Sequence, residues 1–193
     1  MKKFLAMSIL AACSSSVFAD VNYSLSITQP EHHLGNVSVE FPQTAQAHLD
    51  IKLPAWRTGR YEILNLANGV RFFEAKDDDG KALKWEKIDH STWRVHLNEP
   101  TQVNVDYQVY ANELGKRARH IDDSHAFIDA SGFFMFSESF RQDPVKVELN
   151  VPKEWRSVSG MENAGSKHSF KAADYDILVD SPIETGINEL HKF

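Results

Sequence analysis

The residues best suited to chemistry lie in one short stretch, where His120 and His125 flank the sequence Ile-Asp-Asp-Ser. Imidazole and carboxylate groups at this spacing can bind a metal ion, or they can act as a general base and the group that orients it. The same sequence fits a polar loop between two strands, in which Asp122 and Asp123 accept hydrogen bonds from turn amides. We favour the loop, and keep His120, Asp122, Asp123 and His125 as candidate contacts to a ligand or partner.

Other signatures of catalysis are absent from the sequence. The chain has nine histidines, but no H-E-x-x-H pair that would place two imidazoles on one helical face beside a glutamate base. His32 and His33 are adjacent, so on a strand they would point to opposite faces. There is also no G-x-S-x-G motif and no P-loop. The sequence therefore predicts no catalytic residue, no bound metal and no cofactor.

The N-terminal residues have the pattern of a bacterial secretory signal peptide. Two lysines precede the apolar run from Phe4 to Ala12, and Val17-Phe18-Ala19 supplies a small-x-small cleavage site. We therefore expect a signal peptide over residues 1–19, cleavage after Ala19, and a periplasmic or secreted domain over residues 20–193. The apolar run is too short to be a membrane span.

A second processing pattern overlaps the first. Leu10-Ala11-Ala12-Cys13 fits the sequence that precedes a lipid-modified cysteine in bacterial lipoproteins. Cleavage there would leave a signal of 12 residues, which is short for the apolar core that export requires. A lipid anchor at Cys13 is therefore the minor alternative.

Charge and cysteine content narrow the class of partner. The net charge is −6, and removal of residues 1–19 takes away two lysines, which leaves 174 residues with a charge of −8. An acidic protein is a poor partner for nucleic acid or for an anionic membrane surface. Cys13 is the only cysteine, so the mature domain would contain no disulfide. We expect a peptide or protein as the partner, and no nucleic acid.

Hydrophobic residues recur at every second position along most of the chain, as they do in half-buried β-strands. Only the segments around Arg60–Leu66 and Ala172–Tyr175 are weak candidates for helix. A chain of this length can bury roughly 70% of its unfolded surface, so one domain with one core is expected. The sequence predicts an all-β fold, a single antiparallel β-sandwich over residues 20–193. Strands are expected around Tyr23–Ile27, Val37–Phe41, Leu49–Leu53, Trp93–Leu97, Val103–Val109 and Val145–Val151.

The segment Gly132–Phe136 is apolar at consecutive positions, which predicts a strand with two faces to bury. One face could form an exposed patch around Phe134 that associates with a partner or with a second copy of the chain. The alternative, which we favour, is that both faces are covered inside the domain, for instance by the chain near Trp155. Trp56 has two similar interpretations: an aromatic that stacks on a ligand, or a buried plug of its own turn.

Four segments together resemble the N-terminal domain of the glycyl aminopeptidase family of zinc metallopeptidases, metallopeptidase family 61. The family pattern L-P-x-W-x-x-G-x-Y corresponds to Leu53–Tyr61, and Ser91–Val95 follows it. A V-Y-A-x-x-L run that leads to D-x-x-H-A-F corresponds to Val109–Phe127, and Y-D-x-L-V-D-S-P-I-E corresponds to Tyr175–Glu184. The segments occur in the order of the family and cover nearly the whole mature chain.

The resemblance implies a β-sandwich that precedes a thermolysin-like catalytic domain carrying H-E-x-x-H, and then a PDZ-like domain. The zinc ligands and the catalytic glutamate of the family belong to the catalytic domain, so no catalytic role is transferred to this chain, and we expect it to lack both later domains. The four segments also contain the candidate contacts Trp56, Arg60, Tyr61 and Arg119. Two positions depart from the family: Arg60 replaces a small residue before Tyr61, and Asp129-Ala130 replaces Asn-Gly.

Three functions remain open. The leading hypothesis is an exported, non-catalytic binding domain that engages a peptide or protein partner. The second is a role in an enzyme. The chain is then either a non-catalytic subunit of a split zinc aminopeptidase, completed in trans by a separately encoded zinc domain, or a hydrolase with its site around His120–His125. The third is a degenerate peptidase fragment with no role beyond folding.

Overall fold

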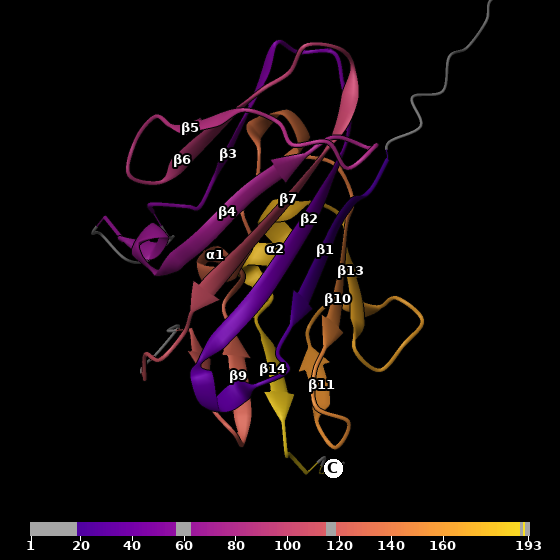
Figure 1. The fold of residues 1–193 in the computed structure, drawn as a ribbon. Coiled ribbons are helices and arrows are strands. Elements are labelled where there is room, and N and C mark those ends of the chain that lie inside the picture. The colour runs from indigo at the N-terminus through magenta and orange to yellow at the C-terminus, as the bar shows by residue number, and fades with distance from the viewer. Residues whose placement is uncertain (1–18, 57–62, 115–118, 190, 192–193) are drawn as a thin grey trace, which may run out of the picture.

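The computed structural model describes residues 19–56, 63–114, 119–189 and 191, and its main element is a seven-stranded sheet (Figure 1). Neighbouring strands pair antiparallel except β1 and β10, which are parallel. Their order across the sheet is β12 (Glu162–Asn163), β13 (Ser169–Ala172), β10 (Val145–Asn150), β1 (Val21–Ser26), β2 (Leu34–Thr44), β7 (Thr101–Tyr110) and β4 (Val70–Lys76).

Two smaller sheets and two short helices complete the described fold. The four-stranded sheet has the order β11 (Arg156–Ser159), β14 (Ile183–Gly186), β9 (His125–Ile128) and β8 (His120–Ile121). The three-stranded sheet has the order β3 (His48–Lys52), β6 (Thr92–His96) and β5 (Trp85–Lys87). The helices are α1 (Ala130–Phe133) and α2 (Tyr175–Asp180), and 3-10 turns cover Pro30–His32, Leu66–Gly69 and Glu138–Phe140.

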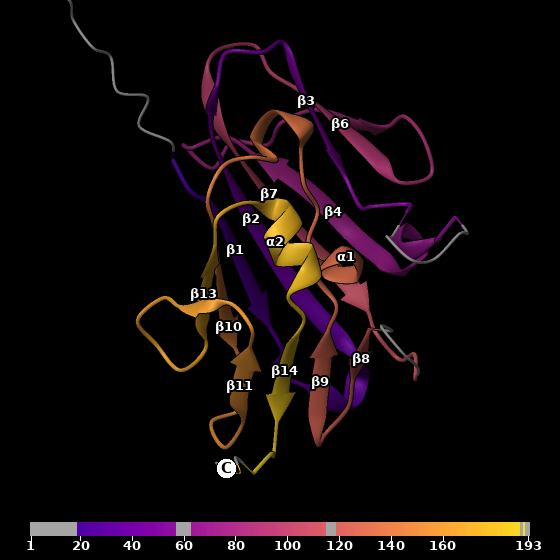
Figure 2. The ribbon, with the colours of Figure 1, turned by 180° about the vertical axis from the view of Figure 1, so that it is seen from behind.

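The core lies between the inner face of the large sheet and this second layer. Figure 2 shows α1 and α2 over that face, with β14 and β9 continuing the layer below them. Along β1, β7 and β10 buried residues alternate with exposed or half-buried ones, so the other face of the sheet stays polar. The three-stranded sheet packs onto β4 through aromatic rings, since Phe73 stacks on Trp93 at 5.4 Å and contacts Trp85 edge-on at 5.1 Å. These layers confirm the predicted all-β sandwich-like domain, and each expected strand is present.

A bulge in the edge strand β4 sends two consecutive phenylalanines in opposite directions. The pairing of β4 with β7 shifts register between Arg71 and Glu74, and Phe72 has a left-handed backbone with φ of 53°. Phe73 is buried, whereas the Phe72 side chain is 77% exposed. The extra residue therefore lets Phe73 enter the core at the cost of an unfavourable backbone conformation at Phe72.

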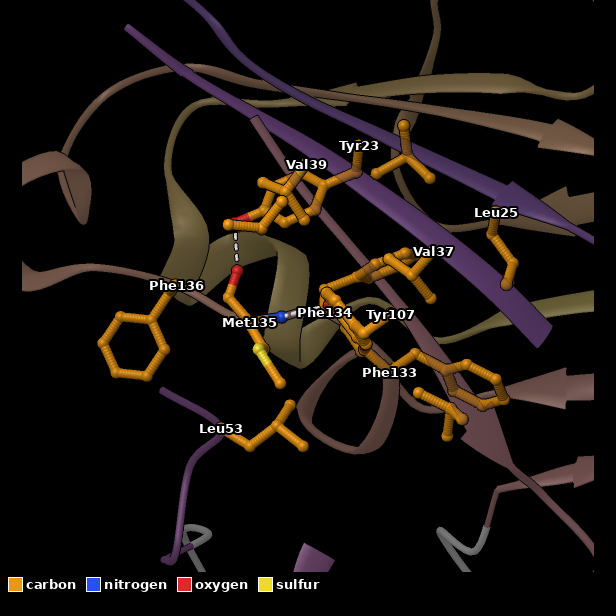
Figure 3. Packing of buried hydrophobic residues seen from close by; sticks show 14 of the residues in the cluster. Tyr23, Leu25, Val37, Val39, Leu53, Tyr107, Phe133, Phe134, Met135 and Phe136 are labelled. Atoms are coloured by element: carbon orange, nitrogen blue, oxygen red, sulfur yellow. Dashed lines mark hydrogen bonds between the residues drawn. The ribbon is translucent and has the colours of Figure 1, made fainter. Parts of the chain in front are cut away.

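The segment Gly132–Phe136 is buried, so the less favoured interpretation, an exposed patch around Phe134, is wrong. The chain here forms the short helix α1 and then an extended stretch, instead of the expected strand, and Phe134 has 0% exposure. Tyrosine hydroxyls from β1, β7 and α2 reach its backbone: Tyr23 donates to the Met135 carbonyl at 3.0 Å, Tyr107 to Phe133 at 2.8 Å and Tyr175 to Phe134 at 2.8 Å. Figure 3 shows the aromatic and aliphatic side chains that enclose the segment. Both faces are covered, as the favoured alternative predicted, and the covering groups include these tyrosines.

The C-terminal segment behaves as a turn into a strand. Helix α2 begins after Asp174, whose carboxylate accepts a hydrogen bond from the Ile177 amide at 2.8 Å, and ends at Asp180. Ser181 and Pro182 then lead into β14, which lies between β11 and β9. Across the described residues, no helix has the length and apolar character that a membrane crossing requires.

Candidate functional site

The described surface contains a groove with a volume of about 950 Å³. Segments far apart in the sequence line it: the end of β3 with the loop that follows, the loop before β6, part of β9, and helix α2 with the turn after it. All four segments that resemble the peptidase family contribute. The residues that line the groove are Lys52, Leu53, Pro54, Ala55, Trp56, Asp89, Ser91, Thr92, Phe127, Asp129, Phe136, Arg141, Tyr175, Asp176, Val179, Asp180 and Pro182.

Backbone hydrogen bonds fix the groove walls. The amide of Lys52 donates to the carbonyl of Phe136 at 2.8 Å, and the reverse bond measures 2.9 Å. The amide of Leu53 donates to the carbonyl of Ser91 at 3.1 Å, which ties the second segment to the first. The residues around Leu53 are therefore held on both sides before the chain enters the loop at Pro54.

Two stacked aromatic rings form the floor of the groove. The Phe136 and Tyr175 rings lie 4.4 Å apart with 19° between their planes. Phe136 is 6% exposed and Tyr175 is buried, so the stack belongs to the core as well as to the groove. Lys52 Nζ and Arg141 Cζ lie 5.3 Å and 5.5 Å from the centre of the Phe136 ring, within reach of a cation–π interaction.

Ion pairs hold the two cationic side chains of the groove in place. Lys52 Nζ lies 2.9 Å from Glu138 Oε1, and Arg141 Nη2 lies 2.8 Å from Asp176 Oδ1. The hydrogen bond from Lys52 lowers the pKa of the Glu138 carboxyl, and the hydrogen bond to Asp176 raises the pKa of Arg141. Both pairs are partly exposed, so they orient the side chains more than they stabilise the fold.

Trp56 is the predicted contact that the groove contains. Its side chain is 54% exposed, which excludes the buried-plug interpretation and fits an aromatic that contacts a ligand. Arg60 and Tyr61, the two other candidates from the same segment, lie outside the described residues. Lys52, Arg141 and Asp180 were missed, because in the sequence nothing distinguishes them from other surface charges.

The predicted cluster around His120 forms a second site, at the hairpin between β8 and β9. One oxygen of Asp122 accepts hydrogen bonds from the amides of Ser124 and His125 at 2.8 Å and 2.9 Å, and the other lies 2.9 Å from His120 Nε2. Asp122 thus caps the turn, as the loop interpretation predicted, while it also brings the two imidazoles to within 5.1 Å of each other, measured between ring centres. Asp123 is exposed at the tip of the hairpin.

Arg119 is a buried structural residue, not a surface contact. Its side chain is 5% exposed, and Nη1 donates to the carbonyls of Leu66 and Gly132 at 2.6 Å and 3.3 Å. Burial lowers the pKa of its guanidinium, and the Glu113 carboxylate 3.5 Å away opposes that shift. A Cβ at Gly69 would lie 2.5 Å from Nη2, so this glycine leaves room for the guanidinium.

Comparison with known sequences identifies the family of the chain. The sequence profile of the peptidase M61 N-terminal domain matches residues 22–187. Among curated proteins, no sequence matches the chain.

Solved structures share the fold. An aminopeptidase N family protein from Idiomarina loihiensis superposes with a TM-score of 0.82 and 25% identity, over 90% of this chain and 30% of that protein. An M1 zinc metallopeptidase from Deinococcus radiodurans gives a TM-score of 0.51 and 13% identity, over 86% of this chain and 41% of that protein. Leukotriene A4 hydrolase from Saccharomyces cerevisiae gives 0.52 and 11%, over 86% and 28%. This chain therefore spans less than half the length of each of these proteins.

The profile and the fold lead to the same assignment. The match covers most of the described sandwich, from β1 to the residue after β14. The Idiomarina structure extends the likeness to nine tenths of the chain. The chain belongs to the peptidase M61 N-terminal domain family.

Proposed function

We propose that this chain is an exported, non-catalytic binding domain that engages a peptide or protein partner through the groove. One observation carries the proposal: the four segments that resemble the peptidase family, although distant in sequence, line a single groove. Its volume of about 950 Å³ lies at the upper end of the range typical of ligand sites, roughly 300–1,000 Å³.

The chemistry of the groove suits binding. Trp56 offers an exposed aromatic surface at its rim, and aromatic side chains of this kind anchor many interfaces. Lys52 and Arg141 are held by ion pairs, so they present fixed donors and an apolar stem without a large loss of side-chain entropy on binding.

A second candidate is a non-catalytic subunit of a zinc aminopeptidase that is completed in trans. The matches to the peptidase M61 N-terminal domain and to 30% of an aminopeptidase N family protein from Idiomarina loihiensis support it. In this candidate the groove contacts a separately encoded zinc peptidase domain.

Site-specific photocrosslinking tests both candidates. Benzoylphenylalanine replaces Asp180 or Trp56 in the groove, and Phe72 on the edge strand β4 serves as an exposed control position. In a periplasmic extract we expect a discrete adduct from positions 56 and 180 and none from position 72. A zinc peptidase in the adduct selects the second candidate. Equal labelling from position 72, or no adduct at all, contradicts a binding role of the groove. The remaining hypothesis is then a degenerate peptidase fragment with no role beyond folding.

Export is a separate part of the proposal, and the two lysines, apolar run and Val17-Phe18-Ala19 pattern support it. The intact mass of protein recovered from the periplasm tests it, with Asp20 as the expected first residue. A species that begins at Cys13 and carries acyl chains identifies a lipoprotein instead. Cytoplasmic protein that retains residues 1–19 contradicts export.

A further inference from the structure

The hairpin β8–β9 and the neighbouring strand β14 bring three ionisable side chains to one face of a sheet. His120 pairs with Phe127, and Phe127 pairs with Glu184, so these three residues form a row across the strands. His125 lies two residues before Phe127 on the same strand, and therefore on the same face. Asp122 lies in the turn between the two strands of the hairpin.

Three ionisable side chains of this hairpin lie close enough to one another to hold one metal ion. One ligand atom each from His120, Asp122 and His125 falls within a group whose members are all within 4.8 Å of one another. His120 Nε2 lies 2.9 Å from Asp122 Oδ2, and His125 Nδ1 lies 3.3 Å from Asp122 Oδ1. A tetrahedral ion with bonds of about 2.0–2.1 Å has ligand atoms about 3.3–3.4 Å apart, so side-chain rotation has to close the remaining gap within a group that spans up to 4.8 Å.

The backbone holds this arrangement in place. Asp122 Oδ1 accepts from two turn amides and from the Ser124 hydroxyl at 2.7 Å, which leaves Oδ2 as the oxygen available to an ion. A Cβ at Gly186 would lie 2.5 Å from the Cβ of His125 and 2.7 Å from the Ser124 carbonyl oxygen, so the glycine opposite His125 lets β14 approach the hairpin closely. The ring of His120 is buried, whereas the His125 side chain is 40% exposed and leaves an entry path.

An ion at this position replaces an existing contact. When it binds His120 Nε2 and Asp122 Oδ2, it takes the place of the 2.9 Å hydrogen bond between these two atoms.

We propose that His120, Asp122 and His125 bind one divalent ion of the zinc type, with water completing the coordination. Two imidazoles and a carboxylate form a ligand set that Zn²⁺ commonly takes. His120 Nδ1 is buried and has no hydrogen-bond partner in the described parts of the chain. Metal-bound imidazoles normally donate this second N–H, so we expect an affinity about 10–100-fold below that of a site with complete outer hydrogen bonds.

Titration of tag-free, metal-free protein with ZnCl₂ in a calorimeter tests the site at neutral pH. We expect one ion per chain and at least a tenfold loss of affinity in both His125→Ala and Asp122→Asn. The asparagine keeps the oxygen that caps the turn and removes the ligand charge, and circular dichroism establishes that each variant is folded. The matched control is His96→Ala, which removes the imidazole of another histidine–carboxylate pair, 3.0 Å from Glu86, and should leave zinc affinity unchanged.

Cobalt gives an independent readout. Co²⁺ in a tetrahedral nitrogen and oxygen site should produce visible absorption bands that disappear in Asp122→Asn and persist in His96→Ala. Absence of stoichiometric zinc binding by the wild-type protein overturns the proposal, and so does equal affinity in wild type and folded His125→Ala. Because these readouts do not involve the groove, they stand or fall separately from the crosslinking experiment.

Discussion

The hydroxyl of Tyr107 accepts a hydrogen bond from the amide of Met135 at 2.8 Å and donates another to the carbonyl of Phe133 at the same distance. Tyr107 is on β7, and the two backbone groups flank Phe134, so one phenol oxygen satisfies both ends of a turn in the core. Buried backbone groups need such partners, because each one left without a hydrogen bond costs about 1–3 kcal/mol. The tyrosine therefore makes it possible to bury this irregular segment.

Tyr107→Phe should lower the free energy of unfolding by about 2–4 kcal/mol, because it leaves the Met135 amide and Phe133 carbonyl unpaired. Denaturant unfolding measures the change. Tyr110→Phe on the same strand is the control: its hydroxyl is more exposed and accepts one bond from Asn112 at 3.3 Å, so the change should stay within about 0.5 kcal/mol. Equal effects of the two substitutions would contradict this account.

Phe134→Ala should destabilise the fold by about 3–5 kcal/mol, the usual cost of removing a fully buried phenylalanine. The Tyr23 ring, whose centre lies 5.1 Å from that of Phe134, loses its contact as well. Leu114→Ala, at a side chain that is 84% exposed, is the control and should change stability little. A folded, fully stable Phe134→Ala variant would restore the interpretation of this segment as surface.

The sequence predicts the regular strands well, since alternation such as Val103, Val105, Tyr107 and Val109 appears only where one face of a strand is buried. It fails at Gly132–Phe136, because a continuous apolar run fits a buried strand and a buried helix equally. The irregular path of this segment depends on hydrogen bonds from three tyrosine hydroxyls. These tyrosines lie 112, 26 and 41 residues along the chain from the carbonyls to which they donate. No local pattern contains that information.

The two candidate sites also differ in how far the sequence could predict them. The cluster of His120, Asp122 and His125 could be anticipated because its members are contained in six residues, and a tight turn keeps them together. The groove could not be anticipated, since Lys52 and Arg141 are far apart in the sequence and meet through their contacts with Phe136 and Glu138. Its one local signal was the resemblance of four segments to a known family, which indicated which segments matter but not that they converge.

Acid should destabilise the protein partly through Asp122. Its pKa is lower in the folded protein than the value near 3.9 of an unfolded aspartate, so its stabilising contribution is present above about pH 4 and is lost as the pH falls further. Asp122→Asn should therefore flatten the dependence of unfolding free energy on pH below about pH 4. Asp123→Asn, at the exposed neighbour, should leave that dependence unchanged. Chemical denaturation at several pH values between about 2 and 6 compares the slopes; the same slope in wild type and Asp122→Asn contradicts the prediction.

Phe72→Gly should stabilise the protein, although it removes an aromatic side chain. The φ of 53° at Phe72 lies in the left-handed region, which costs a residue with a Cβ about 1–2 kcal/mol, whereas glycine adopts it without strain. The side chain is 77% exposed, so its removal sacrifices little buried area. The extra backbone entropy of an unfolded glycine, about 0.5–1 kcal/mol, opposes this gain, and the net expectation is a rise in the free energy of unfolding of about 0.5–1 kcal/mol.

The control is Val158→Gly in strand β11, where the side chain is 39% exposed and the backbone is extended, and where glycine should destabilise the fold. Thermal and denaturant unfolding of both variants measure the difference. If Phe72→Gly instead lowers stability as Val158→Gly does, the Phe72 side chain contributes packing at the edge of β4 that outweighs the relief of its backbone.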